Sequence, residues 1–232
     1  SSPGGAGASS TAGIVFGGYV GPSYSNCTEE YDGTSFSNGG TLITARNNIY
    51  GAGTSTAAIG TGGQIAYQTS TSNTEEYDGS SWTTSGVLNT KRYNNHGFGS
   101  QIAAVGLGGI SYPPLVSHNV TEEYNGSSWT NVTAQPAFSY QNGTAGSLTA
   151  GVVFGGNGTA PGESTITTTN EYDGTNWASG GALGNARSST TQGGAGTQTA
   201  CLAAGSRAGS PINPSALVEE YNGTSWTAGG AL

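Results

Sequence analysis

The chain has 232 residues, of which only 8% are charged, and its formal net charge at pH 7 is −8. An acidic chain without a basic patch is a poor match for nucleic acid, and no apolar run reaches the ~18 residues of a membrane span. We therefore expect neither a nucleic-acid partner nor membrane insertion.

Five copies of one phrase divide the chain into units. The phrase reads TEEYDGTSF in the first copy and VEEYNGTSW in the last, and its tyrosines are Tyr31, Tyr77, Tyr124, Tyr172 and Tyr221. The intervals between these tyrosines are 46, 47, 48 and 49 residues, a period typical of repeat architectures. We predict a single domain of five units at about residues 1–42, 43–88, 89–135, 136–183 and 184–232.

Each unit contains four short segments that are typical of β-strands. A Gly-Ala-rich segment comes first, and an apolar segment ending in Gly-Gly follows at 11–18, 56–63, 102–109 and 150–156, with a drifted copy at 200–206. The third segment is the phrase itself, and the fourth begins five residues after its tyrosine. The aromatic residues at that start are Phe36, Trp82, Trp129, Trp177 and Trp226. Turn residues separate the segments, and no window shows the 3.6-residue period of a helix.

An Asp-Gly or Asn-Gly dipeptide joins the third and fourth segments of every unit. Such dipeptides accept a positive φ and mark tight hairpins. Four antiparallel strands repeated five times form either a closed propeller or an open array. We predict an all-β fold, a closed five-bladed β-propeller, because closure leaves few exposed strand edges.

The ordered set of motifs resembles the kelch-type β-propeller repeat. The resemblance rests on Gly-Gly at the end of the second strand, Glu-x-Tyr-Asp/Asn in the third and Trp at the start of the fourth, and it covers essentially the whole chain. Typical kelch rings have six or seven blades, so five departs from the family. The sequence EEYDGSSW is also similar to repeats of predicted virion structural proteins of marine bacteriophages. This resemblance implies a virion or another extracellular location.

The arginines occupy one fixed place in the units. Arg46, Arg92 and Arg187 each stand ten residues after the aromatic residue of the preceding unit, where one unit has Ser139 instead. That same unit has Asn170 in place of the first glutamate of the phrase. We therefore predict partly buried structural pairs within the units, namely Arg46–Glu75, Arg92–Glu122 and Arg187–Glu219. The alternative is an acidic ring that binds cations.

The first unit departs from this pattern. Its glutamate, Glu29, has no arginine at the matching place, because the chain begins at Ser1. We expect the α-amino group or another cation beside Glu29, or a longer natural chain.

Loops between the second and third strands differ among the units, at 19–26, 64–73, 110–120, 157–169 and 207–217. In a propeller they share one face with the connections between units, and variable loops on a rigid scaffold are the usual place for recognition. Aromatic and amide side chains there suit a sugar or a protein partner, although the rings could simply cover the blade ends. The candidate binding-face residues are Tyr19, Tyr24, Tyr50, Tyr67, Tyr93, His96, Tyr112 and Tyr140.

Two cysteines, Cys27 and Cys201, lie in the first and last units, which ring closure makes neighbours. A disulfide would staple the ring, but facing sheets lie about 10 Å apart, farther than a disulfide tolerates. We therefore expect two independent buried thiols.

Seven Asn-x-Ser/Thr sequons mark candidate glycosylation sites if the protein passes through a secretory pathway. They begin at Asn26, Asn119, Asn125, Asn131, Asn142, Asn157 and Asn222.

Enzymatic chemistry has little support in the sequence. The histidines are His96 and His118, too few for the Tyr-Cys and paired-His centre of kelch-like copper oxidases, and no residues have metal-ligand spacing. We expect a non-enzymatic structural or decoration module without cofactor or metal, which binds other protein subunits through the variable loops. A carbohydrate-binding adhesin or lectin that recognises surface glycans is the alternative, and a kelch-like enzyme is a third reading.

Overall fold

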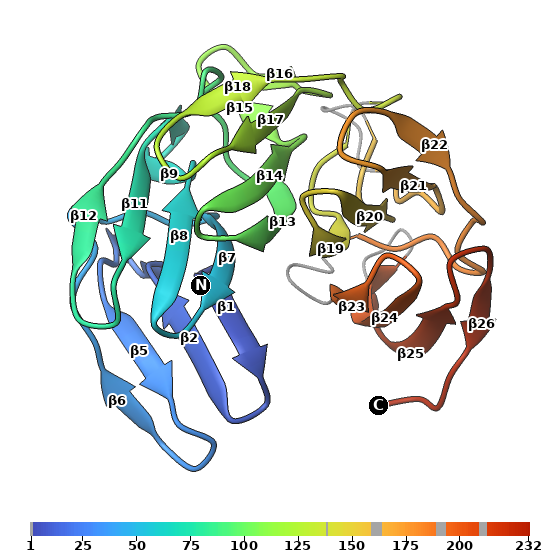
Figure 1. Ribbon diagram of the computed structural model, residues 1–232, viewed down its shortest axis with the longest axis horizontal. Coiled ribbons are helices and arrows are strands. Elements are labelled where there is room, and N and C mark those ends of the chain that lie inside the picture. The colour runs from blue at the N-terminus through green and yellow to red at the C-terminus, as the bar shows by residue number, and fades with distance from the viewer. Residues whose placement is uncertain (1, 138, 159–163, 189–193, 209–212) are drawn as a thin grey trace.

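The computed structural model describes residues 2–137, 139–158, 164–188, 194–208 and 213–232. Every helix or strand element in this part of the chain is a β-strand. Figure 1 shows five small sheets arranged around a common axis, which is a five-bladed β-propeller.

Each blade is a sheet of four antiparallel strands that follow one another in chain order. The sheets are β1-β2-β5-β6, β7-β8-β11-β12, β13-β14-β17-β18, β19-β20-β21-β22 and β23-β24-β25-β26. Their bounds are β1 Gly4–Ser9, β2 Ala12–Phe16, β5 Thr28–Tyr31 and β6 Phe36–Asn38; β7 Tyr50–Thr54, β8 Ala57–Thr61, β11 Thr74–Tyr77 and β12 Trp82–Thr84; β13 His96–Ser100, β14 Ala103–Leu107, β17 Thr121–Tyr124 and β18 Trp129–Asn131; β19 Gly143–Ser147, β20 Ala150–Phe154, β21 Thr169–Tyr172 and β22 Trp177–Ser179; β23 Gly194–Thr197, β24 Ala200–Ala208, β25 Asn213–Tyr221 and β26 Trp226–Ala228.

The repeated phrase forms the outer hairpin of every blade. In the second blade Tyr77 pairs directly with Trp82, and their rings lie 5.0 Å apart. The turn between them needs a positive φ, and Gly79 supplies it at 93°. Asp78 closes the turn by accepting the backbone N–H groups of Ser80 and Ser81 at 2.8 Å each. The local chemistry of the phrase therefore builds the hairpin that the sequence predicts.

The core lies between blades rather than inside any one of them. In the described residues, four clusters of buried apolar side chains each combine residues of two adjacent blades. Between the first and second blades, for example, Phe16 packs edge-on against Trp82 with ring centroids 4.7 Å apart. A single blade has too little apolar surface to be stable alone, so each blade depends on its neighbours.

Two side-chain hydrogen bonds repeat at these four junctions. The tyrosine hydroxyl of the later blade donates to the second glutamate of the earlier blade, and the indole N–H donates to the threonine at the start of the earlier blade's third strand. The tyrosine pairs are Tyr77–Glu30, Tyr124–Glu76, Tyr172–Glu123 and Tyr221–Glu171. The tryptophan pairs are Trp82–Thr28, Trp129–Thr74, Trp177–Thr121 and Trp226–Thr169, at 3.0, 3.0, 3.2 and 2.9 Å.

The first and last blades face each other across an opening. Figure 1 shows this opening between β1–β2 on one side and β23–β25 on the other, so the five blades trace an arc. The closed ring expected from the sequence is not what the described residues form.

Candidate functional site

Small hairpins extend the variable loops of the first three blades. They consist of β3 (Tyr19–Val20) with β4 (Ser23–Tyr24), β9 (Gln64–Ala66) with β10 (Thr69–Ser70), and β15 (Ile110–Ser111) with β16 (Val116–Ser117). In the fifth blade the loop is flanked by the lengthened strands β24 and β25. We call the surface formed by these hairpins the loop face. Residues 159–163 and 209–212 of the predicted loops lie outside the described residues.

Three tyrosines gather on the loop face of the second and third blades. We call Tyr67, Tyr93 and Tyr112 the tyrosine cluster. Tyr67 lies at the tip of the β9–β10 hairpin with 83% of its surface exposed. Burial raises the pKa of Tyr93, and the electrostatic effect of Tyr67 and Tyr112 raises it further. The cluster thus combines the exposed ring of Tyr67 with the half-buried side chain of Tyr93.

Backbone hydrogen bonds hold this cluster in place. Tyr112 N–H donates to Ser70 Oγ at 3.1 Å, and Ser70 N–H donates to the Tyr112 carbonyl at 3.0 Å, which links the hairpins of adjacent blades. Tyr93 and Ile110 exchange two backbone hydrogen bonds of 2.9 and 3.0 Å. These hydrogen bonds therefore fix the backbones of Tyr93 and Tyr112, so a partner that contacts them loses little conformational entropy on binding.

A second aromatic group lies on the hairpin of the first blade. Tyr19 and Tyr24 pair across β3 and β4, with ring centroids 5.4 Å apart and the planes at 70°. Val20 beside them is 68% exposed. Burial, and then the neighbouring Tyr19, raise the pKa of Tyr24. This hairpin therefore offers an aromatic and aliphatic surface separate from the tyrosine cluster.

Three of the predicted binding-face residues are not accessible. Tyr50, His96 and Tyr140 are only 5%, 7% and 5% exposed. Tyr50 begins β7 and donates its hydroxyl to the Phe98 carbonyl of the next blade at 3.1 Å. His96 begins β13, and burial lowers its pKa to about 4, so it is neutral near pH 7. We expected these residues in connections between blades, but Tyr50 and His96 start the inner strands β7 and β13.

Exposed aliphatic side chains on the loop face were missed by the sequence analysis. They are Val20, Ile65, Leu115 and Val116, each at least 41% exposed. Each hairpin that carries a predicted tyrosine therefore also carries an aliphatic residue. The available signal was the presence of apolar residues within these variable loops, but periodicity alone does not identify such residues as exposed.

The three predicted Arg–Glu pairs form buried ion pairs. Arg46 Nη2 lies 3.2 Å from Glu75 Oε1 and Arg92 Nη1 lies 2.5 Å from Glu122 Oε1, and Arg187 pairs with Glu219. Burial lowers the pKa of Arg46 to about 10 although Glu75 opposes the change, so the guanidinium stays charged at neutral pH.

Each of these glutamates also holds the connection between two blades. Glu122 accepts the backbone N–H groups of Asn89 and Thr90 at 2.7 and 3.2 Å, and Glu75 accepts those of Ile43 and Thr44 at the same distances. The pairs are buried and bonded to the protein's own backbone. This favours the structural reading over an acidic ring that binds cations.

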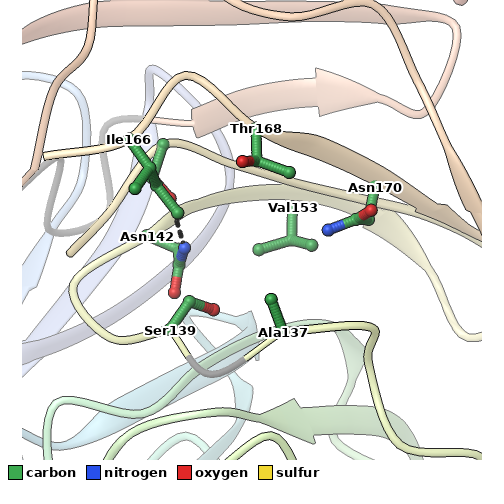
Figure 2. Close-up of a pocket in the computed structure, with 8 residues that line it drawn as sticks. Ala137, Ser139, Asn142, Val153, Ile166, Thr168 and Asn170 are labelled. Atoms are coloured by element: carbon green, nitrogen blue, oxygen red, sulfur yellow. Dashed lines mark hydrogen bonds between the residues drawn. The ribbon is translucent and has the colours of Figure 1, made fainter. Parts of the chain in front are cut away.

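The fourth blade has a cavity in the region where the other blades have this ion pair. Its volume is about 10 Å³, near the minimum for one water molecule. Figure 2 shows Ser139, Asn142 and Asn170 around it. Gln135, which stands where other units have leucine, is buried and accepts a 3.4 Å hydrogen bond from Ser139. This third compensating substitution was not predicted from the sequence.

Glu29 of the first blade is exposed. Among the described residues no arginine, lysine or histidine forms an ion pair with it. The α-amino group that was expected beside Glu29 belongs to Ser1, which lies outside the described residues.

The two cysteines are independent thiols, and only one of them is buried. Cys201 is buried in the layer between the fourth and fifth blades, whereas Cys27 is exposed. The expectation of two buried thiols was wrong for Cys27. The equivalent residue of the fourth blade, Thr168, is also exposed, so this position directly before the third strand can face solvent.

Two of the seven sequons are inaccessible in the folded protein. Asn142 and Asn157 are each 2% exposed, and their amide groups donate to the Gly155 carbonyl at 2.5 Å and to Gln141 Oε1 at 2.8 Å. They serve to join strands and loops rather than to carry a glycan. Asn26, Asn125, Asn131 and Asn222 are exposed, and Asn119 is half-buried.

The described part of the chain contains no group of three or more His, Cys, Asp or Glu side chains placed to hold a metal ion. Within the same residues, no helix has the length and apolar character to cross a membrane.

Comparison with known proteins gives no family for this chain. No protein-family model matches the sequence, and no curated protein matches it. The five-bladed propeller therefore rests on the chain's own structure, and a propeller fold suggests a protein-interaction module.

Proposed function

We propose that this protein is a non-enzymatic interaction module of a virion or another extracellular assembly, and that its loop face binds a protein subunit. The observation that carries the proposal is the tyrosine cluster. Tyrosine contributes large contact area at low entropic cost and is enriched at interface hot spots. Tyr67 is 83% exposed on a hairpin that is anchored to its neighbour.

The aliphatic neighbours favour a protein partner over a small molecule. Ile65 is 41% exposed on the same hairpin as Tyr67, and Leu115 and Val116 are similarly exposed on the next. Aromatic rings with aliphatic side chains around them form the apolar centre of a protein interface, and the surrounding Ser, Thr and Asn suit its polar rim.

The composition of the chain supports the proposed location. Only 8% of the residues are charged, far below the roughly 25% of an average soluble domain. Such a surface of Ser, Thr, Asn and Gly supports a virion or extracellular location. The resemblance of the repeat sequence to phage virion proteins supports the same location. We also propose that the repeat is of the kelch type.

The experiment is a binding measurement with matched alanine variants. Immunogold electron microscopy first determines whether the chain is on the native particle, and the wild-type chain is then bound to immobilised subunits purified from that particle. Tyr67→Ala and Tyr112→Ala should each weaken binding about tenfold or more. Ile102→Ala, which removes a 67% exposed side chain from the opposite end of a blade, should leave binding unchanged. Equal affinities of all three variants would refute the assigned face.

A carbohydrate ligand is the second candidate, and one observation favours it. The Tyr67 ring is nearly fully exposed, which suits stacking against a sugar ring, and the Asn48 and Gln64 amides lie hydrogen-bonded at 3.3 Å on the same blade. A glycan array probed with the wild-type and Tyr67→Ala chains tests it. A glycan bound by the wild type and lost in the variant would establish the lectin reading in place of the subunit.

A further inference from the structure

The cavity of the fourth blade lies in the place that a guanidinium group takes in other blades. In the second and fifth blades the arginine donates to three backbone carbonyls at matching positions. They belong to Gly60, Gly62 and Asn73 for Arg46, and to Ala203, Gly205 and Leu217 for Arg187. The strand registers give Val153, Gly155 and Thr168 as the matching residues of the fourth blade, and all three line the cavity. The cavity is therefore the arginine site of a blade that has Ser139 instead.

The surroundings of this site are neutral, whereas those of the other arginine sites are charged. Pro136 stands where the other connections have Ile43, Asn89 and Gly184, whose backbone N–H groups each donate to the glutamate of their blade. Proline has no backbone N–H, so the connection offers one donor fewer to a carboxylate. None of the described residues that line the cavity has an acidic or basic side chain. A buried cation would have no carboxylate beside it, which is costly, so the site suits a neutral ligand.

Buried amide groups point into the site. Asn142 is 2% exposed, and its Nδ2 donates to the Gly155 carbonyl at 2.5 Å, as the arginine does in other blades. The Oδ1 atom of Asn142 is buried and accepts no hydrogen bond from the described residues. Figure 2 shows this oxygen on the side of Ser139, and the Asn170 amide pointing toward Val153. A buried acceptor without a partner is costly, so the site favours a ligand that donates a hydrogen bond.

We propose that the fourth blade binds one buried water molecule at its arginine site. The water donates to Asn142 Oδ1 and accepts from the Asn170 amide, and its second hydrogen faces the carbonyls that bind a guanidinium elsewhere. A cavity of about 10 Å³ admits a single water molecule, and a buried water typically makes about three hydrogen bonds. The water thus joins the connection that carries Asn142 to the strand β21, as the ion pair does in other blades. This inference concerns the interior of the blade and does not rest on the loop face.

Crystal structures of the wild-type chain, with and without a rubidium chloride soak, test the site. Electron density for one water should lie about 2.7–3.2 Å from Asn142 Oδ1 and from the Asn170 amide nitrogen. A site without density would overturn the proposal. Anomalous scattering from rubidium at this place would show that the ligand is a cation, which would also overturn it.

Two variants show whether the water takes the place of the guanidinium. Ser139→Arg with Asn170→Glu restores the residues of the other blades, so the guanidinium should occupy the site and the water density should disappear. Ser139→Ala removes only a hydroxyl group and should keep the water. Water that stays in place beside the new guanidinium would contradict the shared site. Loss of the water in Ser139→Ala would contradict its assignment to the two amides.

Nuclear magnetic resonance gives a readout in solution. The side-chain NH₂ group of Asn142 should show a cross-peak to a long-lived water molecule, whereas the exposed Asn125 amide should not. The variant Ser139→Ala with Thr168→Val removes two hydroxyl groups beside the cavity that exchange protons with solvent, and it should keep the cross-peak. A cross-peak that vanishes in this variant would come from a hydroxyl group rather than from bound water, and the proposal would fail.

Discussion

Arg92 Nη1 lies 2.5 Å from Glu122 Oε1, and neither side chain has exposed surface. Arg92 also donates to the Gly106 carbonyl at 3.1 Å, and Glu122 accepts two backbone N–H groups of the connection that enters its blade. The pair therefore ties a strand and a connection together at one buried point. Removing one partner leaves an uncompensated charge, whereas removing both does not.

We predict that Arg92→Met and Glu122→Gln each lower the free energy of unfolding by about 3–5 kcal/mol. The double variant Arg92→Met with Glu122→Gln removes both charges, so its loss should be smaller than the sum of the two single losses. Urea unfolding followed by tryptophan fluorescence measures this. Strictly additive losses would show that the two side chains act independently.

The fourth blade gives the reciprocal prediction. Asn170→Glu places a carboxylate beside the cavity with no arginine to pair with it, so the unfolding free energy should fall by about 1–3 kcal/mol. Adding Ser139→Arg to the same chain should recover stability relative to Asn170→Glu alone. Thermal unfolding of the two variants decides the point. If Ser139→Arg makes the Asn170→Glu chain less stable still, the cavity cannot take the pair.

We predict that the outer turn of the second blade tolerates Asp78→Asn but not Asp78→Ala. Asp78 Oδ1 accepts two backbone N–H groups, and Asn125 does the same at 3.0 and 2.9 Å in the next blade. Asp78→Asn should therefore leave the urea midpoint unchanged, because an amide oxygen can accept the same two bonds. Asp78→Ala loses the acceptor of both bonds and should lower the urea midpoint. Equal urea midpoints for the two variants would argue against the turn bonds.

The fold was predictable because its determinants are local and repeated. The phrase from Thr74 to Trp82 contains a strand, a positive-φ turn and the first residue of the next strand, so its period predicts blades directly. The pairing of Arg92 with Glu122 was also predictable, because Ser139 and Asn170 change together in the blade that lacks it.

The parts that could not be predicted depend on distances between blades. Tyr50 and Tyr67 look alike in the sequence, yet one packs between blades and the other is 83% exposed. The opening of the arc is likewise the sum of four junction geometries, and no single residue encodes it.

Thiol chemistry should distinguish the two cysteines. Cys27 is exposed, whereas Cys201 is buried and burial raises its pKa to about 12. The thiolate is the reactive form, so Cys201 should react with a thiol-specific reagent only when the protein unfolds. Titration of the native chain should give one reactive thiol, and titration in denaturant should give two. Cys27→Ser should abolish the native reaction, whereas rapid reaction of that variant would contradict the burial of Cys201.

Alkaline pH should weaken the blade junctions. Burial, and then the hydrogen bond to Glu76, raise the pKa of Tyr124 to about 12, and Tyr77 and Tyr221 reach similar values for the same reasons. A tyrosine whose pKa is higher in the folded state holds its proton more tightly there than in the unfolded chain. Its contribution to stability is fully present below the unfolded value near 10 and is lost as the pH rises through 12. The urea midpoint should therefore stay level up to pH 10 and then fall.

The Tyr124→Phe variant isolates one of these groups. The variant lacks the hydroxyl that would ionise at high pH. It should also be less stable than the wild type at pH 7, because the hydrogen bond to Glu76 is lost. Between pH 10 and 12 its midpoint should fall less steeply than that of the wild type. Tyr67→Phe alters an exposed ring and should follow the wild-type profile. Parallel profiles for wild type and Tyr124→Phe would mean that another group causes the alkaline transition.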